Sequence, residues 1–289
     1  PDRVTQAGTI SPVFKPFDPS SGGEIVDNMK LRIDGSRLAD RRYLLLKLDE
    51  LRRAKENSVT FKSAGRFREQ AFDILLRGTS RAFDFSDEPP AVIDRYDTGC
   101  FEPSDAVKKR NSYAKQFSPV ALGRQMLMAR RLCEAGCRFV TVTCGGWDMH
   151  GGGKEFTMTD GIGSLTPAID KAVSAFIEDV EQRGLSEKIL LIVTGEMGRT
   201  PKKEPGGGTG HWARSTPLLV AGGGLRMGQV IGQTDRMGGE PTTKPYMPQH
   251  LLATVMRTVF DLGEAGLVAG LPTDLVQLIT DSEPIRELF

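Results

Sequence analysis

The sequence predicts an α/β fold with a mainly parallel sheet flanked by helices. Two apolar runs of strand type, residues 139–143 and 189–194, lie on either side of a helical pattern at 166–183. Apolar, β-branched strands joined through a helix are typical of a βαβ unit in a sheet covered on both faces. Each run is followed by a glycine-bearing loop rich in polar residues. Because ligands of such sheets bind at the carboxyl ends of the strands, these loops are where we expect a functional site.

The composition excludes some classes of partner. The 38 Lys and Arg residues nearly balance 37 Asp and Glu, which gives a formal net charge of +1. The absence of a basic block argues against nucleic acid as a partner. No apolar run approaches the roughly 20 residues of a transmembrane segment. The four cysteines show no paired CxxC spacing, which favours small buried residues and does not settle the compartment (Cys100, Cys133, Cys137 and Cys144).

Residues 1–35 are rich in Pro, Gly, Ser and Asp and predict an irregular lead-in. The chain starts at Pro1 without a methionine or a signal peptide, and no buried strand precedes residue 138. A parallel α/β sheet normally opens with such a strand. We therefore expect the chain to be the C-terminal portion of a longer protein, lacking the N-terminal strand or strands of its sheet.

Residues 36–135 predict a mainly helical section. Helices are expected in four segments with apolar residues at helical spacing or with helix boundary residues: 36–53, 64–77, about 89–95 and 118–134. The polar stretch 97–116 is expected to be a loop. We expect this section and the α/β section at 136–289, which carries the site, to form one structural domain.

The remaining elements follow from their boundary residues. The helix at 166–183 is expected to begin at Thr166 and Pro167 and to end at Gly184. A third strand is predicted at 216–221 and a short one at 229–231. Pro248 is expected to begin a helix that ends at Gly263, and a short helix is expected near Leu275.

Four residues of the predicted strand-exit loops have side chains that bind metals. Asp148 and His150 follow the first strand, Glu196 follows the second, and His211 ends a glycine-rich loop before the third. A loop Asp or Glu by itself is more often a turn or cap residue than a ligand. Together, two carboxylates and two imidazoles suit Zn²⁺ or Mn²⁺ better than Ca²⁺, which prefers oxygen ligands. The pattern therefore predicts a divalent-metal site.

Arg199 follows Glu196 in the same loop. Its forked N–H donors suit a phosphate or sulfate oxygen, and the alternative is a solvated loop arginine. The glycine run 206–210 is not a nucleotide-binding P-loop, because no strand directly precedes it and it lacks the P-loop lysine. His250 falls in the first turn of a predicted helix and is expected at the surface.

Several motifs of this chain resemble a known family. "GGWDMHGG", "GEMGRTPK", "GHW" and "LLVAGGGLRMGQVIGQTD" look like an uncharacterised bacterial family, domain of unknown function 1501, of the alkaline phosphatase and sulfatase superfamily. The resemblance covers most of residues 30–265. It implies an alkaline-phosphatase-like fold and export to the periplasm or the extracellular space.

The resemblance also implies roles for individual residues. Asp148 and His150 match the superfamily's carboxylate–histidine pair for one metal, and His211 matches its late histidine ligand. Glu196 stands where the superfamily usually has aspartate, and Met197 where it has histidine. These two departures weaken the match for a second metal. An aspartate commonly precedes the late histidine in the nearer branch, and here that residue is Gly210.

These observations lead to two functional hypotheses. The first is a metal-dependent hydrolase of phosphate or sulfate esters, in which Arg199 holds the anion of a small ester or of a sulfated or phosphorylated glycan. The superfamily's nucleophile belongs to the opening strand, so this chain alone is expected to be inactive. The second is a non-catalytic, exported binding protein for anionic glycans or a protein partner. The oligomeric state stays open.

Overall fold

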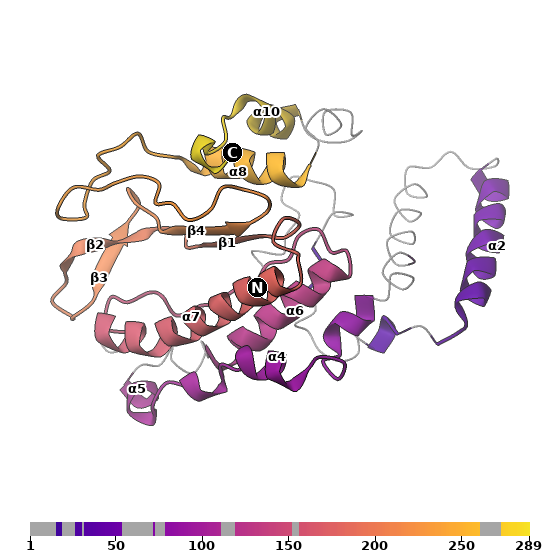
Figure 1. The fold of residues 1–289 in the computed structure, drawn as a ribbon, viewed down its shortest axis with the longest axis horizontal. Helices are drawn as coiled ribbons and strands as arrows, with labels where there is room; N and C mark the ends of the chain where they lie inside the picture. Colours follow the sequence, from indigo (N-terminus) through magenta and orange to yellow (C-terminus); the bar gives the residue numbers. More distant parts are fainter. Residues whose placement is uncertain are drawn as a thin grey trace. The chain divides into compact units, whose positions relative to one another are not determined.

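The computed structural model describes residues 16–18, 27–30, 32–53, 72, 79–110, 119–151, 156–260 and 273–289. The chain divides into two compact units, one of Pro1–Asp87 with Arg131–Cys137 and one of Glu88–Arg130 with Arg138–Phe289. The architecture is α/β, with helices and short antiparallel pairs of strands (Figure 1).

The first unit contains helix α2 (Gly35–Arg53) and the short 3-10 helix η3 (Thr79–Phe83). α2 confirms the predicted helix, and the Asp34 carboxylate accepts a hydrogen bond from the Ser36 N–H at its start. Leu38 is buried, whereas Leu48 is 58% exposed. The helix predicted at 64–77 lies outside the described residues, apart from Phe72.

Short helices precede the sheet in the second unit: α4 (Pro90–Arg95), η4 (Gly99–Phe101), α5 (Asp105–Arg110) and η6 (Pro119–Ala121). η6 leads directly into α6 (Leu122–Glu134). The loop prediction for 97–116 is wrong over η4 and α5. Asp97 accepts a hydrogen bond from the Gly99 N–H, and Ser104 accepts one from the Val107 N–H. Such local caps satisfy the free donors of a first turn and allow polar sequence to be helical.

Helix α7 (Met158–Gln182) starts earlier than predicted. The Thr157 hydroxyl caps it by accepting a hydrogen bond from the Asp160 N–H. Pro167 therefore lies inside the helix rather than at its first turn, where its missing N–H removes one bond of the helical ladder. The helix ends near the predicted position, and Gly184 follows it with a φ of 66° that favours glycine.

A buried ionic network ties α7 to the preceding helices. Asp179 accepts hydrogen bonds from Arg130 at 2.9 Å and from Arg183 at 2.7 Å. Both arginines also pair with the Glu88 carboxylate. Tyr96 donates its hydroxyl to Asp179, and burial together with that carboxylate raises the pKa of Tyr96. Because each buried charge has an oppositely charged neighbour, the network offsets much of its desolvation cost.

The described strands form two antiparallel pairs. β1 (Leu190–Thr194) pairs with β4 (Leu218–Gly222), and β2 (Gly198–Lys203) pairs with β3 (Thr209–Trp212). The β2–β3 hairpin is inserted between β1 and β4 in the chain. Figure 1 shows α8 (Pro248–Val259) on one side of the β1–β4 pair and α7 on the other.

The strands predicted at 189–194 and 216–221 are confirmed, but the parallel sheet is not found among the described residues. Residues 139–143 form no strand, and Phe139 is 78% exposed. A strand needs a partner for its N–H and C=O groups, and none of the backbone hydrogen bonds found among the described residues supplies one there. The chain between β1 and β4 contains the β2–β3 hairpin and no crossover helix, and β4 runs antiparallel to β1. The strand at 229–231 is also wrong, since Val230 is 95% exposed.

Among the described residues, the strands of the second unit are followed by α8, α10 (Thr273–Asp281) and the 3-10 helix η7 (Arg286–Leu288). α8 begins at the predicted proline, and α10 confirms the short helix near Leu275. The Thr254 hydroxyl of α8 accepts a hydrogen bond from the Ile285 N–H, which anchors the C-terminal segment. No helix among the described residues has both the length and the apolar character needed to cross a membrane.

Candidate metal and anion site

Alternation along an extended segment presents Asp148 and His150 on one side. Met149, between them, is buried and packs with Phe156 and Leu165 in a small hydrophobic core. Its sulfur also lies against Gly161 of α7, where an added Cβ would be only 2.7 Å away. Because successive side chains of an extended chain point in opposite directions, burying Met149 directs its two neighbours outward.

The β2–β3 hairpin brings the other half of the site. Arg199 of β2 and His211 of β3 are cross-strand partners. The glycine-rich turn of the hairpin is seated directly on the segment that carries His150. The Thr209 N–H donates to the Met149 carbonyl at 2.9 Å, and a Cβ on Gly208 would lie 2.0 Å from that same oxygen. The glycine run therefore serves close packing of backbone on backbone.

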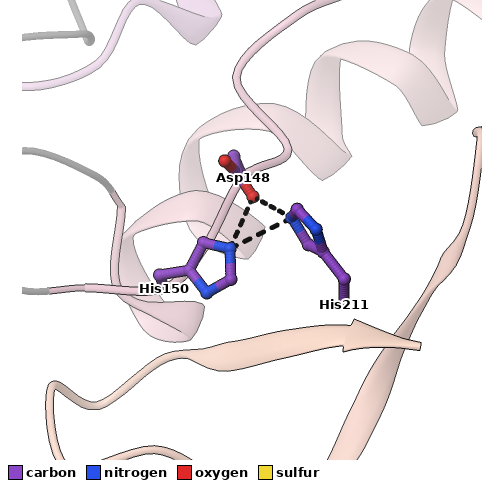
Figure 2. Close-up of side chains that lie close together, drawn as sticks. All are labelled: Asp148, His150 and His211. Carbon is purple, nitrogen blue, oxygen red and sulfur yellow. Dashed lines mark hydrogen bonds and ion pairs between the residues drawn. The ribbon is translucent and has the colours of Figure 1, made fainter.

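Three ligand-type atoms converge from these two segments (Figure 2). The Nε2 atoms of His150 and His211 are 3.0 Å apart. Asp148 Oδ1 lies 2.8 Å from His211 Nε2 and 3.0 Å from His150 Nε2. These residues form the group of possible metal ligands found among the described parts of the chain. The side chains of Asp148 and His211 are about half exposed, so the group is open to solvent.

Arg199 lies within the same group. Its Nη2 donates to Asp148 Oδ1 at 2.7 Å and to the Trp147 carbonyl. Its Nη1 donates to the Thr209 carbonyl at 3.0 Å and lies 3.5 Å from His150 Nε2. Two backbone carbonyls, one from each half of the site, thus hold the guanidinium in place.

The electrostatics of the site keep Asp148 ionised. Burial acts to raise the pKa of this carboxyl, but hydrogen bonds from His211 and Arg199 and the nearby charges lower it, and the net pKa lies below the ordinary 3.8. Because the folded-state pKa is lowered, the stabilisation is present above the pKa of the unfolded chain. It is lost as the pH falls through the lowered value.

Glu196, the fourth predicted ligand, is not part of this group. It is exposed in the turn between β1 and β2. A different carboxylate approaches instead: Glu204 Oε2 lies 3.5 Å from His150 Nδ1. Sequence reasoning missed Glu204, and its only signal was a position on the turn between Arg199 and His211.

The donor set fits a divalent ion. One carboxylate oxygen and two imidazole nitrogens are ligands of Zn²⁺ and Mn²⁺, whereas Ca²⁺ prefers oxygen alone. Ligand atoms around a tetrahedral zinc with bonds of about 2.0–2.1 Å are roughly 3.3 Å apart. The observed separations of 2.8 to 3.0 Å require only a small expansion to match this.

Comparison with known proteins places the chain in a family without assigning an activity. No curated protein and no solved structure matches the chain significantly. The sequence model of one family, described as "Protein of unknown function (DUF1501)", matches residues 2–289. The match spans nearly the whole chain, which therefore belongs to the DUF1501 family.

Proposed function

We propose that this chain carries the metal site of a divalent-metal-dependent hydrolase acting on phosphate or sulfate esters. The observation that carries the proposal is the convergence of Asp148, His150 and His211 within 4.8 Å of one another, with Arg199 beside them. Three protein ligands leave a coordination position open, which is the usual design of a catalytic rather than a structural zinc site. We favour Zn²⁺ or Mn²⁺ over Ca²⁺.

The chain's own residues divide the chemistry between them. Asp148, His150 and His211 would hold the ion. A divalent ion at such a site supplies Lewis acidity towards an ester oxygen. Arg199 binds the anionic group of the substrate: a guanidinium has five N–H donors, and backbone carbonyls already set its orientation. Lys202 and Lys203, exposed on the same strand, add positive charge that attracts an anionic ester or a sulfated or phosphorylated glycan.

From the motifs that resemble the alkaline phosphatase and sulfatase superfamily, we also propose that the protein belongs to that superfamily and is exported. The hydrolase proposal predicts little turnover by this chain alone. The two threonine hydroxyls nearest in sequence to the site residues make structural contacts: Thr200 accepts from the Gly210 N–H and donates to a carbonyl, and Thr209 donates to the Met158 sulfur. Neither is placed as a free nucleophile.

The same observation favours a second candidate, an exported, non-catalytic binding protein for anionic glycans or a protein partner. A site in which Arg199 is paired to Asp148 and the hydroxyls of Thr200 and Thr209 are engaged elsewhere can bind an anion without breaking a bond. The two candidates share Arg199 as the anion-binding group and differ in turnover.

The test measures metal content, metal affinity and turnover. Protein prepared without chelator should contain Zn or Mn by elemental analysis, and calorimetry should show tighter binding of Zn²⁺ or Mn²⁺ than of Ca²⁺. Hydrolysis of a chromogenic phosphate and a chromogenic sulfate is then compared for this chain and for a version extended upstream. Activity of the extended version, lost in His150→Ala, supports the hydrolase. Inactivity of both versions, with a sulfated glycan bound in an Arg199-dependent manner, supports the binding protein. Absence of any divalent-metal binding contradicts the metal site.

A further inference from the structure

The side chain of Glu204 lies behind the metal-binding face of His150. Glu204 follows β2, and its backbone is held on both sides of the hairpin turn. Its N–H donates to the Gly208 carbonyl at 2.8 Å, and its carbonyl accepts from the Gly207 N–H at 3.0 Å. The side chain therefore extends from a fixed point of the turn.

The missing side chain at Gly210 gives this carboxylate its space. A Cβ on Gly210 would lie 2.6 Å from Glu204 Oε1, so even an alanine there would displace the carboxylate. From this position the other oxygen, Oε2, lies 3.5 Å from His150 Nδ1. Gly210 immediately precedes His211, so the strand that supplies one ligand also makes room for the group behind another.

The two nitrogens of His150 face chemically different groups. Nδ1 faces Glu204, and an ionised carboxylate can only accept hydrogen bonds. Nε2 faces Arg199 at 3.5 Å and His211 at 3.0 Å. Arginine can only donate, and two facing imidazole nitrogens cannot both carry a proton between them. Asp148 Oδ1 only accepts, and it lies nearer to His211 Nε2 (2.8 Å) than to His150 Nε2 (3.0 Å), which assigns the proton donated to Asp148 to His211. With that proton on His211, the neighbours of His150 favour a proton on Nδ1 and a lone pair on Nε2.

We propose that Glu204 is a positioning residue that acts through His150. It holds the proton on Nδ1 and the ring in place, so that the Nε2 lone pair faces the position that an ion would share with Asp148 and His211. A metal-binding histidine commonly has such a carboxylate on its second nitrogen, which selects the tautomer and makes the ligand more basic. The inference rests on the proposed metal site and adds a residue to it.

The first experiment needs no metal. Long-range ¹H–¹⁵N NMR of the imidazoles reports the tautomer of each of the three histidines in the metal-free protein. His250 is an internal reference, because its Nδ1 accepts from the Met247 N–H and its proton is therefore on Nε2. In the wild type, His150 should carry its proton on Nδ1, and Glu204→Ala should shift it towards Nε2. Gly210→Ala should do the same while keeping the carboxylate, because the new methyl group displaces it.

The second experiment is zinc affinity by calorimetry. Glu204→Ala should weaken Zn²⁺ binding about 10- to 100-fold, Glu204→Gln less, and Glu187→Gln, at an exposed glutamate between α7 and β1, not at all. An unchanged His150 tautomer in both Glu204→Ala and Gly210→Ala overturns the inference. If the wild type binds no metal, the proposed function fails, whereas the tautomer measurement still decides the role of Glu204.

Discussion

Replacing Gly208 with alanine tests how the site is assembled. A Cβ at this position would lie 2.0 Å from the Met149 carbonyl oxygen and 2.2 Å from the His150 carbonyl carbon. These are backbone atoms, which cannot rotate away as the end of a side chain can. The hairpin must therefore move off the segment that carries Asp148 and His150, by more than an ångström at the point of contact.

The size of the effect follows from what this movement breaks. The Thr209 N–H to Met149 carbonyl bond of 2.9 Å is lost, which costs about 1 kcal/mol. Overpacking of a well-packed contact typically costs a further ~1–3 kcal/mol. We therefore expect the free energy of unfolding to fall by about 2–4 kcal/mol in Gly208→Ala. Zinc affinity should fall as well, because His211 moves away from His150.

The control is Gly163→Ala in α7. An added Cβ there meets nothing within 4 Å, and glycine inside a helix is less stable than alanine by roughly 0.5–1 kcal/mol. This variant should be slightly more stable than the wild type and should bind zinc normally. Both are measured by urea unfolding and calorimetry. The two tryptophans, Trp147 and Trp212, flank the ligands and provide the fluorescence signal. Wild-type stability and zinc affinity in Gly208→Ala would refute the close seating of the hairpin.

Three further predictions concern the ligands, the buried network and a thiol. His211→Ala should weaken Zn²⁺ binding by more than the 10- to 100-fold typical of an outer-shell partner. The control His250→Ala should leave Zn²⁺ binding unchanged and only weaken the start of α8. Equal Zn²⁺ affinities of the two variants by calorimetry would argue against His211 as a ligand. Asp179→Asn should lower the free energy of unfolding, measured in urea, by about 3–5 kcal/mol, because it leaves buried arginine charge uncompensated. The control Asp170→Asn, at an exposed position, should change it little. Similar unfolding curves for both variants would contradict the network. Cys133 is half-buried, and this burial raises its pKa from 9.0 to about 11. The contribution of the neutral thiol to stability is therefore fully present below pH 9.0 and is lost as the pH rises towards 11. Alkylation followed by mass spectrometry should be slow at pH 8 and accelerate towards pH 11, and fast modification at pH 8 would contradict the raised pKa.

Local sequence was sufficient for several elements of this protein. α2 follows its predicted span closely, and α8 begins at the predicted Pro248, although it ends at Val259 and not at Gly263. These matches arise because apolar spacing and boundary residues such as Pro248 are local signals. The strands at 189–194 and 216–221 were predicted for the same reason. Asp148 and His150 were predicted as partners, because both lie in the loop that follows the same strand-type run.

The tertiary structure decided what depends on distant partners. The direction of β4 relative to β1 depends on the connection between them, which contains the β2–β3 hairpin and no crossover helix. Residues 139–143 have the composition of a strand but lack a partner for their backbone groups among the described residues. α7 has two possible starting points in the sequence, the Thr157 cap and Pro167. The pattern of apolar residues does not show which of them the helix uses, and the structure has the helix start at the Thr157 cap.

The membership of the site was decided in the same way. Glu196 follows its strand as predicted but lies in an exposed turn, while Glu204 reaches His150 from a hairpin turn that no motif marked. Residue type and spacing determine which side chains are able to bind a metal. Which of them meet is determined by backbone packing, here the contact of Gly208 with the chain at Met149, because a separation of a few ångströms depends on the whole path between the two segments.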